Sequence, residues 1–365
     1  MSAENSLANH FGGSSRYINI ADLRAAARRR LPLPVRAYLE GGADDGYSLE
    51  RNRAAFSAYE LLPRYLVDVS EVDLTTQVLD TTLSMPLMLS PTGMSRLFHP
   101  DAELAVARAA AAAGTMYTLS TVATESIESV ARVSAGPRMF QIYVLRDAGL
   151  NSEFIQRCKE AGYTALCLTV DVPAGGNREN DRRTGMAIPP QFTWRSKLSF
   201  ALHPLWSLAQ LQGPAFDLPN VSQHAGATDM AGLMDYVFSQ FDPSVTWDDA
   251  ERMIAEWDGP FAIKGVLSAE DAKRAADIGA SAVIVSNHGG RQLDGVPGTL
   301  DALPAIADAA GDRLEVLLDG GIRRGTDVLK ALALGAKACM IGRPYIYGLS
   351  VGGEAGVARA LEIFR

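Results

Sequence analysis

The chain has 365 residues, of which 47% are hydrophobic and 21% are charged, as in an ordinary globular protein. Its 34 basic and 42 acidic residues give a net charge of −8, which argues against a nucleic-acid-binding surface. All apolar runs fall short of the roughly 18–20 residues that a membrane-spanning helix needs. The three cysteines, Cys158, Cys167 and Cys339, form no CxxC pair, so we expect reduced core cysteines in a cytoplasmic protein.

Eight short apolar runs recur along the chain, each bounded by glycine, proline or a polar residue. Continuous apolar runs of this length are typical of strands that are buried on both faces of a parallel sheet. The predicted strands lie at residues 86–93, 115–121, 138–144, 163–171, 261–266, 281–289, 313–321 and 337–344.

Helix signals separate these apolar runs. They are Asp101 before residues 102–113, Thr246 before residues 247–257, a Ser268–Asp271 capping box, and Thr326 before a helix that Gly335 closes. Repeated strand–helix alternation predicts an α/β fold, the (β/α)8 TIM barrel. The alternative is a doubly wound sheet, which usually carries GxGxxG after its first strand, and the residues at 91–97 do not match that motif.

The length allows two or three domains, or one barrel of roughly 250 residues with additions. The alternation favours a single domain over residues 18–365. We expect an N-terminal helical arm at 18–80, the barrel at 81–365, and a long loop at 172–245 after the fourth strand. Residues 1–17 contain no apolar stretch and indicate a disordered leader rather than a signal peptide.

Polar and glycine residues gather where the predicted strands end. In a TIM barrel the active site lies at the carboxyl ends of the strands, so these residues are the candidates for the site. They are Ser90, Pro91, Thr92, Gly93, Ser120, Gln141, Tyr143, Thr169, Asp171, Lys264, Ser286, His288, Arg291, Asp319, Gly321, Arg323, Gly342 and Arg343.

Three of these side chains point to chemistry. His288 follows an apolar strand and stands three residues before Arg291, so a base and a cation share one loop. Asp171 ends another strand, where a carboxylate could stabilise the imidazolium, although a helix N-cap is the simpler alternative. Lys264 ends the run FAI, where a charge is costly unless it is paired or functional. The other histidines form no metal-binding spacing, so we expect no metal.

The last two loops predict a phosphate-bearing cofactor. DGGIRRG at 319–325 and IGRP at 341–344 follow the seventh and eighth strands, whose loops often bind phosphate through backbone N–H groups. Arg323 and Arg343 add positive charge there. Lys264 and Ser120 could contact the cofactor's ring.

At residues 286–294, SNHGGRQLD, the chain resembles the FMN-dependent L-2-hydroxy-acid oxidase and dehydrogenase family. The resemblance is closest to its quinone-linked lactate and mandelate dehydrogenases. It runs from about Ile18 to the end, with YLEGGADD, SPTGM, TLSTV, MFQIYV, LTVDVP, KGVLSAEDA, LDGGIRRGTDVLKALALGA and IGRP in order.

The resemblance implies a role for each matching residue. For catalysis and substrate binding it implies a base His288 with its partner Asp171, a carboxylate-binding pair Arg291 and Arg178, substrate-holding hydroxyls on Tyr38 and Tyr143, and a flavin-facing cation Lys264. For FMN it implies ring and ribityl contacts from Pro91, Thr92, Ser120, Gln141, Thr169 and Ser286, and a ribityl–phosphate end formed by Asp319, Gly321, Arg323, Gly342 and Arg343. Tyr38 and Arg178 enter only through the resemblance.

The substrate implied is a small 2-hydroxy carboxylate. Val122 occupies the position of a tryptophan in glycolate oxidase, and with Gly93 it widens the pocket, so we expect L-lactate first and mandelate-like acids second. Electrons would pass to a quinone, or alternatively to oxygen with formation of hydrogen peroxide. His288 would take either the hydroxyl proton or the α-proton, and the sequence leaves both routes open. A third hypothesis for the function is a barrel that binds FMN or phosphate without redox chemistry.

Residues 190–221 carry an aromatic, slightly basic patch of Phe192, Trp194, Phe200, Leu202, Leu205, Trp206 and Leu208 with Arg195 and Lys197. Such a segment can lie at a bilayer interface, so we expect peripheral contact with the inner face of the cell membrane. The alternative is a lid over the active-site mouth. The resemblance further implies a homotetramer, and a C-terminus that ends sooner than is usual in the family.

Overall fold

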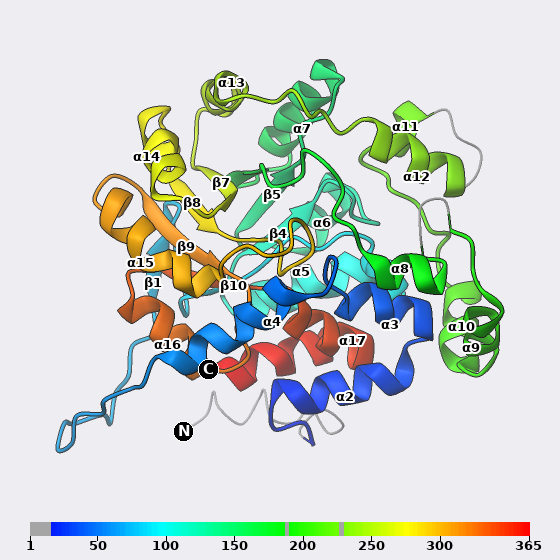
Figure 1. Ribbon diagram of the computed structural model, residues 1–365, viewed down its shortest axis with the longest axis horizontal. Coiled ribbons are helices and arrows are strands. Elements are labelled where there is room, and N and C mark those ends of the chain that lie inside the picture. Colours follow the sequence, from blue (N-terminus) through cyan, green and yellow to red (C-terminus); the bar gives the residue numbers. More distant parts are fainter. Residues whose placement is uncertain (1–15, 187–189, 226–229) are drawn as a thin grey trace.

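Eight parallel strands close into a barrel in a computed structural model that describes residues 16–186, 190–225 and 230–365 (Figure 1). The strand order around the barrel is β10-β3-β4-β5-β6-β7-β8-β9. The strands are β3 (Leu87–Leu89), β4 (Tyr117–Ser120), β5 (Arg138–Ile142), β6 (Ala165–Thr169), β7 (Phe261–Val266), β8 (Ala282–Val285), β9 (Glu315–Asp319) and β10 (Ala338–Ile341). Each lies within one predicted run, so the (β/α)8 prediction is confirmed.

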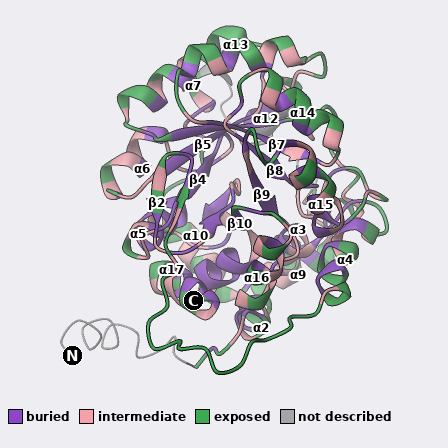
Figure 2. Ribbon diagram, turned by 90° about the vertical axis from the view of Figure 1, so that its left-hand side faces the viewer, coloured by how far each residue is buried: buried purple, intermediate pink, exposed green. Residues whose placement is uncertain are grey.

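The barrel strands are buried on both faces, which explains their continuous apolar sequences (Figure 2). Alternate residues point inward and pack on one another; Met139, Ala262 and Met340 belong to this inner cluster. Their neighbours point outward, and Phe140, Ile263 and Ile341 pack against the surrounding helices. The interior is therefore filled by side chains, and the functional residues can lie only at the barrel ends.

A short hairpin closes the amino-terminal end of the barrel. Its strands are β1 (Thr76–Val78) and β2 (Thr81–Leu83), which pair antiparallel. Val78, Leu79 and Leu83 pack into the inner cluster, and the Leu79 N–H donates to Glu315 Oε2 at 2.9 Å. The hairpin spans residue 80, where we expected the arm to end and the barrel to begin. It was not predicted, because strands of three residues leave no recognisable pattern in the sequence.

Helices surround the barrel and expose their outer faces (Figure 2). They are α5 (Ala102–Ala112), α6 (Ile127–Val133), α7 (Ala148–Glu160), α13 (Trp247–Trp257), α14 (Ala269–Asp277), α15 (Thr299–Ala310), α16 (Gly325–Ala333) and α17 (Arg343–Phe364). The predicted caps at Ser268 and Thr246 are present, with Ser268 Oγ accepting from the Asp271 N–H at 3.1 Å. Helix α16 begins before Thr326, because the Asp327 carboxylate accepts the N–H groups of Arg323 and Arg324.

The N-terminal arm contains α2 (Ile20–Arg30), α3 (Leu33–Glu40), α4 (Tyr47–Ala54) and the 3-10 helix η1 (Ala55–Ala58). Helix α2 packs along α17 (Figure 1). Tyr17 is buried, and residues 1–15 of the expected leader lie outside the described residues. Residues 59–75 continue as an extended segment that projects from the body (Figure 1).

The long connection after β6 is largely helical rather than a simple loop. It contains α8 (Glu179–Thr184), α9 (Trp194–Ala201), α10 (Pro204–Gln212), α11 (Ser222–Ala225) and α12 (Met230–Ser239). Helices α9 and α10 form a hairpin near α3 (Figure 1). Within the described ranges, none of the helices combines the length and apolar character that crossing a membrane requires.

Candidate active site

A cavity with about 1280 Å³ of empty space, counting the open solvent at its mouth, lies at the carboxyl ends of the barrel strands. Most of the predicted site residues line it: Tyr38, Pro91, Thr92, Val122, Tyr143, Arg178, Lys264, His288, Arg291, Asp319, Gly321, Arg323, Gly342 and Arg343. Ser120, Gln141, Asp171 and Ser286 lie behind its wall, and Thr169 lines a neighbouring cavity. Residues far apart in the sequence thus meet where the strand-end argument placed them, while their individual roles stay predictions.

His288 and Asp171 form a hydrogen-bonded pair. His288 Nδ1 lies 3.0 Å from Asp171 Oδ1, which leaves Nε2 of a neutral ring as the acceptor. Burial raises the pKa of Asp171, but the hydrogen bond and charge of His288 and the charge of Lys264 outweigh it and hold the pKa below its usual value. Helix α8 has Arg178 at its N-cap, so the structure places Asp171 on His288 rather than at that helix end.

The backbone after β8 turns sharply to present the imidazole. His288 has a left-handed φ of +59°, and its N–H donates to Ser286 Oγ at 3.1 Å. The arm holds the same loop, because the amides of Asn52 in α4 and Asn287 exchange hydrogen bonds of 2.7 and 2.9 Å. A non-glycine residue with positive φ is strained, and such strain is common where a side chain must be aimed.

Lys264 is buried beside Asp319. Their Nζ and Oδ2 atoms are 3.0 Å apart, and Ser286 Oγ accepts from Lys264 Nζ at 2.9 Å and donates to Asp319 at 2.8 Å. Ser90 Oγ donates to the other carboxylate oxygen at 2.7 Å. Burial lowers the pKa of Lys264, but Asp319 and Asp171 raise it above its usual value, so the ammonium stays charged. A fixed positive charge therefore stands in the cavity wall.

Arg291 and Arg178 bring two cations to one side of the cavity. The Arg291 guanidinium lies 4.7 Å above the Tyr38 ring and donates to the Tyr38 carbonyl at 2.6 Å. Burial, and next the charge of Arg178, lower the pKa of Arg291. The nearby Asp181 is 3.9 Å from Arg178, and burial raises the pKa of this carboxyl. Two close cations in a desolvated place favour an anionic ligand such as a carboxylate.

Tyr143 and Val122 form another part of the wall. Burial, and next the charge of Asp171, raise the pKa of the Tyr143 hydroxyl, so it stays protonated and can donate a hydrogen bond. Its ring packs 5.0 Å from the Phe241 ring, measured between centroids. A Cβ atom on Gly93 would lie 2.5 Å from Val122 Cγ2, so glycine is needed beside this valine.

The site has polar groups and space that fit FMN. Gln141 Nε2 and Thr169 Oγ1 are buried without a hydrogen-bond partner in the described part of the chain. Gln141 Oε1 already accepts from Ser120 Oγ at 3.0 Å. Because unpartnered buried polar groups are costly, a bound heterocycle with donors and acceptors suits these strand ends.

The residues that follow β9 and β10 fit the phosphate group of FMN. Gly321 has a φ of +81°, and a Cβ there would meet the Asn52 carbonyl at 2.0 Å, so only glycine fits. Burial, and next the charge of the neighbouring Arg291, lower the pKa of Arg343 to about 9, so a bound anion would stabilise the charged guanidinium. Arg343 also donates to the carbonyls of Leu39, Gly41 and Gly289, so it ties the arm to the barrel as well.

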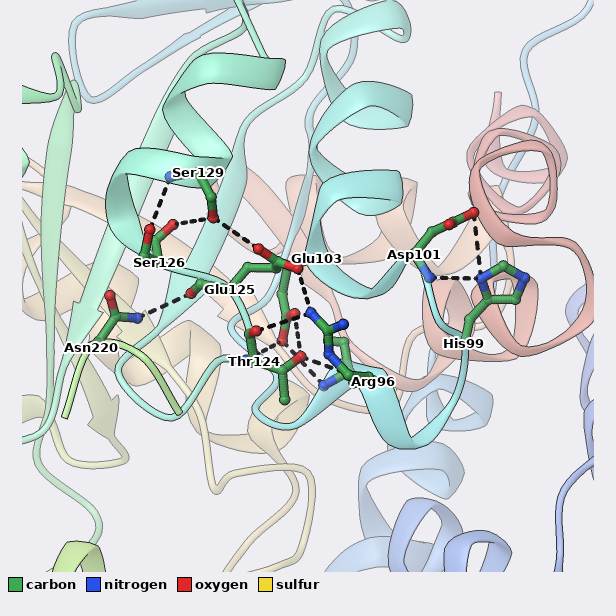
Figure 3. Close-up of polar contacts among 10 residues, drawn as sticks. Arg96, His99, Asp101, Glu103, Thr124, Glu125, Ser126, Ser129 and Asn220 are labelled. Atoms are coloured by element: carbon green, nitrogen blue, oxygen red, sulfur yellow. Dashed lines mark hydrogen bonds and ion pairs between the residues drawn. The ribbon is translucent and has the colours of Figure 1, made fainter. Parts of the chain in front are cut away.

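A buried polar network supports the loop after β3 (Figure 3). The Glu103 carboxylate accepts from Ser95 N at 3.1 Å and from Thr124 N and Oγ1 at 3.0 and 2.6 Å. Arg96 pairs with Glu125 (Figure 3). This network holds the loop that carries Pro91–Met94 and Phe98 into the cavity.

The sequence reasoning missed the apolar lining residues Met94, Phe98, Val172 and Phe241. They stand in loops without strand or helix periodicity. Met94 and Val172 belong to the motifs SPTGM and LTVDVP, which could have identified them, whereas Phe98 and Phe241 belong to none of the motifs.

The model of the family "FMN-dependent dehydrogenase" matches residues 27–365. The chain is 44% identical to an L-lactate oxidase of Nostoc sp., covering 95% of this chain and 91% of that protein. It is 45% identical to an L-lactate dehydrogenase of Pseudomonas aeruginosa, with 94% and 90% covered, and 43% identical to glycolate oxidase 1 of Zea mays, with 95% and 89% covered. A solved structure of the monotopic membrane protein (S)-mandelate dehydrogenase superposes with a TM-score of 0.90 at 39% identity, covering 95% and 92%.

These similarities span nearly the whole chain, at identities that establish common descent. They confirm the predicted family resemblance, the predicted FMN cofactor and the predicted enzyme class. The chain belongs to the FMN-dependent dehydrogenase family and is an FMN-dependent oxidoreductase that acts on CH–OH donors.

Proposed function

We propose that the protein oxidises a small L-2-hydroxy acid, with L-lactate converted to pyruvate as the first choice. The observation that carries this proposal is the pairing of His288 with Asp171 in the wall of a cavity that also holds Arg291 and Arg178. A base and two carboxylate-binding cations are what a 2-hydroxy carboxylate requires. The named relatives act on lactate and glycolate, which supports the same class.

The arginines bind and orient the substrate. Arg291 and Arg178 receive its carboxylate, and the hydroxyl groups of Tyr38 and Tyr143 hold its polar atoms. Holding the carboxylate in a two-arginine clamp fixes the α-carbon relative to His288, which lowers the entropic part of the barrier.

His288 takes the proton at Nε2. The proton comes from the hydroxyl group or from the α-carbon, and Asp171 stabilises the imidazolium in both cases. When bound, FMN supplies the acceptor for the two electrons of the reaction. Lys264, held by Asp319, contributes a positive charge in the cavity wall that favours added negative charge nearby.

The deciding experiment is the absorption spectrum of the purified holoprotein, without oxygen, on addition of a panel of L-2-hydroxy acids. L-lactate is expected to bleach the flavin bands most efficiently. A spectrum that no member of the panel changes would overturn the proposal and favour a non-redox barrel. In air, the ratio of hydrogen peroxide formed to quinone reduced distinguishes an oxidase from a quinone-linked dehydrogenase.

We favour a quinone acceptor reached at the membrane surface through the α9–α10 hairpin. Trp194, Leu202 and Leu205 are 70%, 69% and 80% exposed on it, with Leu198, Leu208 and Leu211 beside them. Phe200 and Trp206, expected in the same patch, instead stack on each other inside the hairpin, and Trp206 Nε1 donates to the Leu97 carbonyl. In the described part of the chain, no residue of α9 or α10 lines the main cavity, which disfavours the lid alternative.

We further propose that the protein is a homo-oligomer joined through residues 61–72, named here the strap. The strap exposes Leu61, Leu62, Tyr65, Leu66, Val67, Val69 and Val72 on an extended backbone. It belongs to no helix or strand, and it carries the acidic residues Asp68 and Glu71, so it suits a protein surface better than lipid. The exposed Arg29 of α2 offers the complementary charge on a second copy, next to Arg28, which already pairs with Glu40.

A further inference from the structure

A second cavity adjoins the main one at the same end of the barrel. It has about 900 Å³ of open space and lies outside the barrel, between β6, β7 and α13. Its walls are mainly apolar: Val144, Leu168, Val170, Val172, Pro173, Phe241, Pro243, Val245, Trp247, Ala250, Ile263 and Val266 line it. No motif in the sequence points to it.

Phe241 and Val172 line both cavities, so they form the wall between them. The phenyl ring of Phe241 packs against Tyr143 at 5.0 Å between centroids, tilted by 46°. Tyr143 is one of the two tyrosines that the proposed mechanism places on the substrate. The ring of Phe241 therefore stands beside the substrate position, with apolar space behind it.

The backbone fixes Phe241 in this position. Phe241 forms an isolated antiparallel bridge with Leu145, two residues beyond Tyr143, which itself directly follows β5. The Arg146 N–H donates to the Gln240 carbonyl at 2.8 Å, and the Asp242 N–H donates to the Val144 carbonyl at 3.2 Å. The fold therefore fixes the backbone at Phe241, and its ring lies between the two cavities.

We propose that Phe241 is the residue that limits the length of the substrate's side chain. Its ring closes the substrate cavity toward the second cavity, so the short side chain of a lactate-like acid fits in front of it. Removal of the ring joins the two cavities, and the apolar walls behind it accept the aryl or long alkyl group of a larger 2-hydroxy acid. This inference rests on the proposed 2-hydroxy-acid oxidation and adds its size selection.

The wall at Gly93 and Val122 leaves no such space at residue 93. Gly93 and Val122 already approach each other so closely that any side chain at residue 93 would clash with Val122. Phe241, in contrast, also lines the second cavity. A longer side chain of the substrate can therefore be accommodated on the Phe241 side of the cavity.

The test compares the FMN-loaded wild type with Phe241→Ala and Phe241→Leu. The measured quantity is kcat/KM for (S)-mandelate and L-3-phenyllactate, each divided by kcat/KM for L-lactate. We expect this ratio to rise at least about 10-fold in Phe241→Ala, the lower end of what one methylene group discriminates in an apolar pocket, and less in Phe241→Leu. Val245→Ala is the matched control, since Val245 lines the second cavity and not the substrate cavity.

A binding measurement tests the size selection without relying on catalytic turnover. The unreactive acid phenylacetate should bind more tightly to Phe241→Ala than to the wild type, while acetate should bind equally to both. An unchanged ratio and unchanged phenylacetate affinity in both folded Phe241 variants would overturn the inference. An equal gain in Val245→Ala would overturn it too. If the wild type oxidises none of the acids, the proposed function itself fails, whatever the variants do.

Discussion

His288 Nδ1 and Asp171 Oδ1 are 3.0 Å apart although the two residues are 117 positions apart in the sequence. The barrel brings them together, because β6 and β8 both end at its carboxyl edge and each residue lies two or three positions beyond the end of its strand. The carboxylate selects the ring tautomer in which Nε2 is free to accept a proton. The pair is therefore the part of the site whose disturbance should affect catalysis most and binding least.

Asp171→Asn is expected to lower kcat by about 10²–10⁴-fold, the range of general acid–base contributions, because the amide cannot stabilise an imidazolium. The KM for L-lactate should change much less, since the arginines that bind the carboxylate remain. Steady-state kinetics of the FMN-loaded variant provides the measurement, and its flavin spectrum verifies cofactor loading. A variant with near wild-type kcat would show that Asp171 only supports the loop.

The acid stability of the protein should reflect Asp171 and Asp319. Native contacts hold the pKa of both carboxyls below the usual value, by His288 for Asp171 and by Lys264 for Asp319, although burial opposes this in each case. The two ionised carboxylates contribute fully to the free energy of unfolding above about pH 3.9, the pKa of an aspartate in the unfolded chain. This contribution is lost as the pH falls through the lower pKa of the native state. Urea unfolding between pH 3 and pH 7 should show a smaller acid-dependent loss in Asp171→Asn than in the wild type. Equal pH dependence in the two proteins would contradict this assignment.

The barrel and the place of the His288–Asp171 pair could be predicted because both depend on local patterns. Buried parallel strands have continuous apolar sequences, and the strand ends locate His288, Asp171 and Lys264. Phe241 could not be predicted, because it reaches the site through one backbone bridge at the end of a long insertion. The orientation of Trp206 was equally hidden, since an aromatic residue in an amphipathic helix can face either the protein or the solvent.

Lys264 and Asp319 should be energetically coupled. Asp319→Asn leaves a buried ammonium without its counterion, which we expect to cost about 3–5 kcal/mol in the free energy of unfolding. The double variant Lys264→Met with Asp319→Asn should regain a large part of that loss, because no unpaired charge remains. Urea unfolding of the apoproteins gives the free energies of unfolding of the wild type, both single variants and the double variant, which together form a double-mutant cycle. Additive effects of the two changes would mean that the ion pair contributes nothing of its own.

The α9–α10 hairpin should govern binding to lipid. Leu205→Glu combined with Leu208→Glu removes two exposed apolar side chains, each worth about 1.5–3 kcal/mol when fully buried, so vesicle partitioning should fall by more than about 10-fold. Leu329→Glu on α16 is the control, since Leu329 is 52% exposed on another surface. Co-sedimentation with vesicles of bacterial phospholipids is the measurement. Equal loss in the control, or no binding by the wild type, would refute the membrane assignment.

The strap should govern self-association. Leu62 and Leu66 are 95% and 107% exposed, so Leu62→Ser with Leu66→Ser removes apolar surface without disturbing the core. Because the proposed association would cover this apolar surface, we expect the variant to have a lower mass in solution than the wild type, at an unchanged flavin content. Light scattering coupled to size exclusion gives the mass. The α9–α10 variant serves as the reciprocal control: it should keep the wild-type mass while the strap variant keeps its vesicle binding. Exchange of these two phenotypes would mean that the strap contacts lipid and the hairpin contacts the second copy.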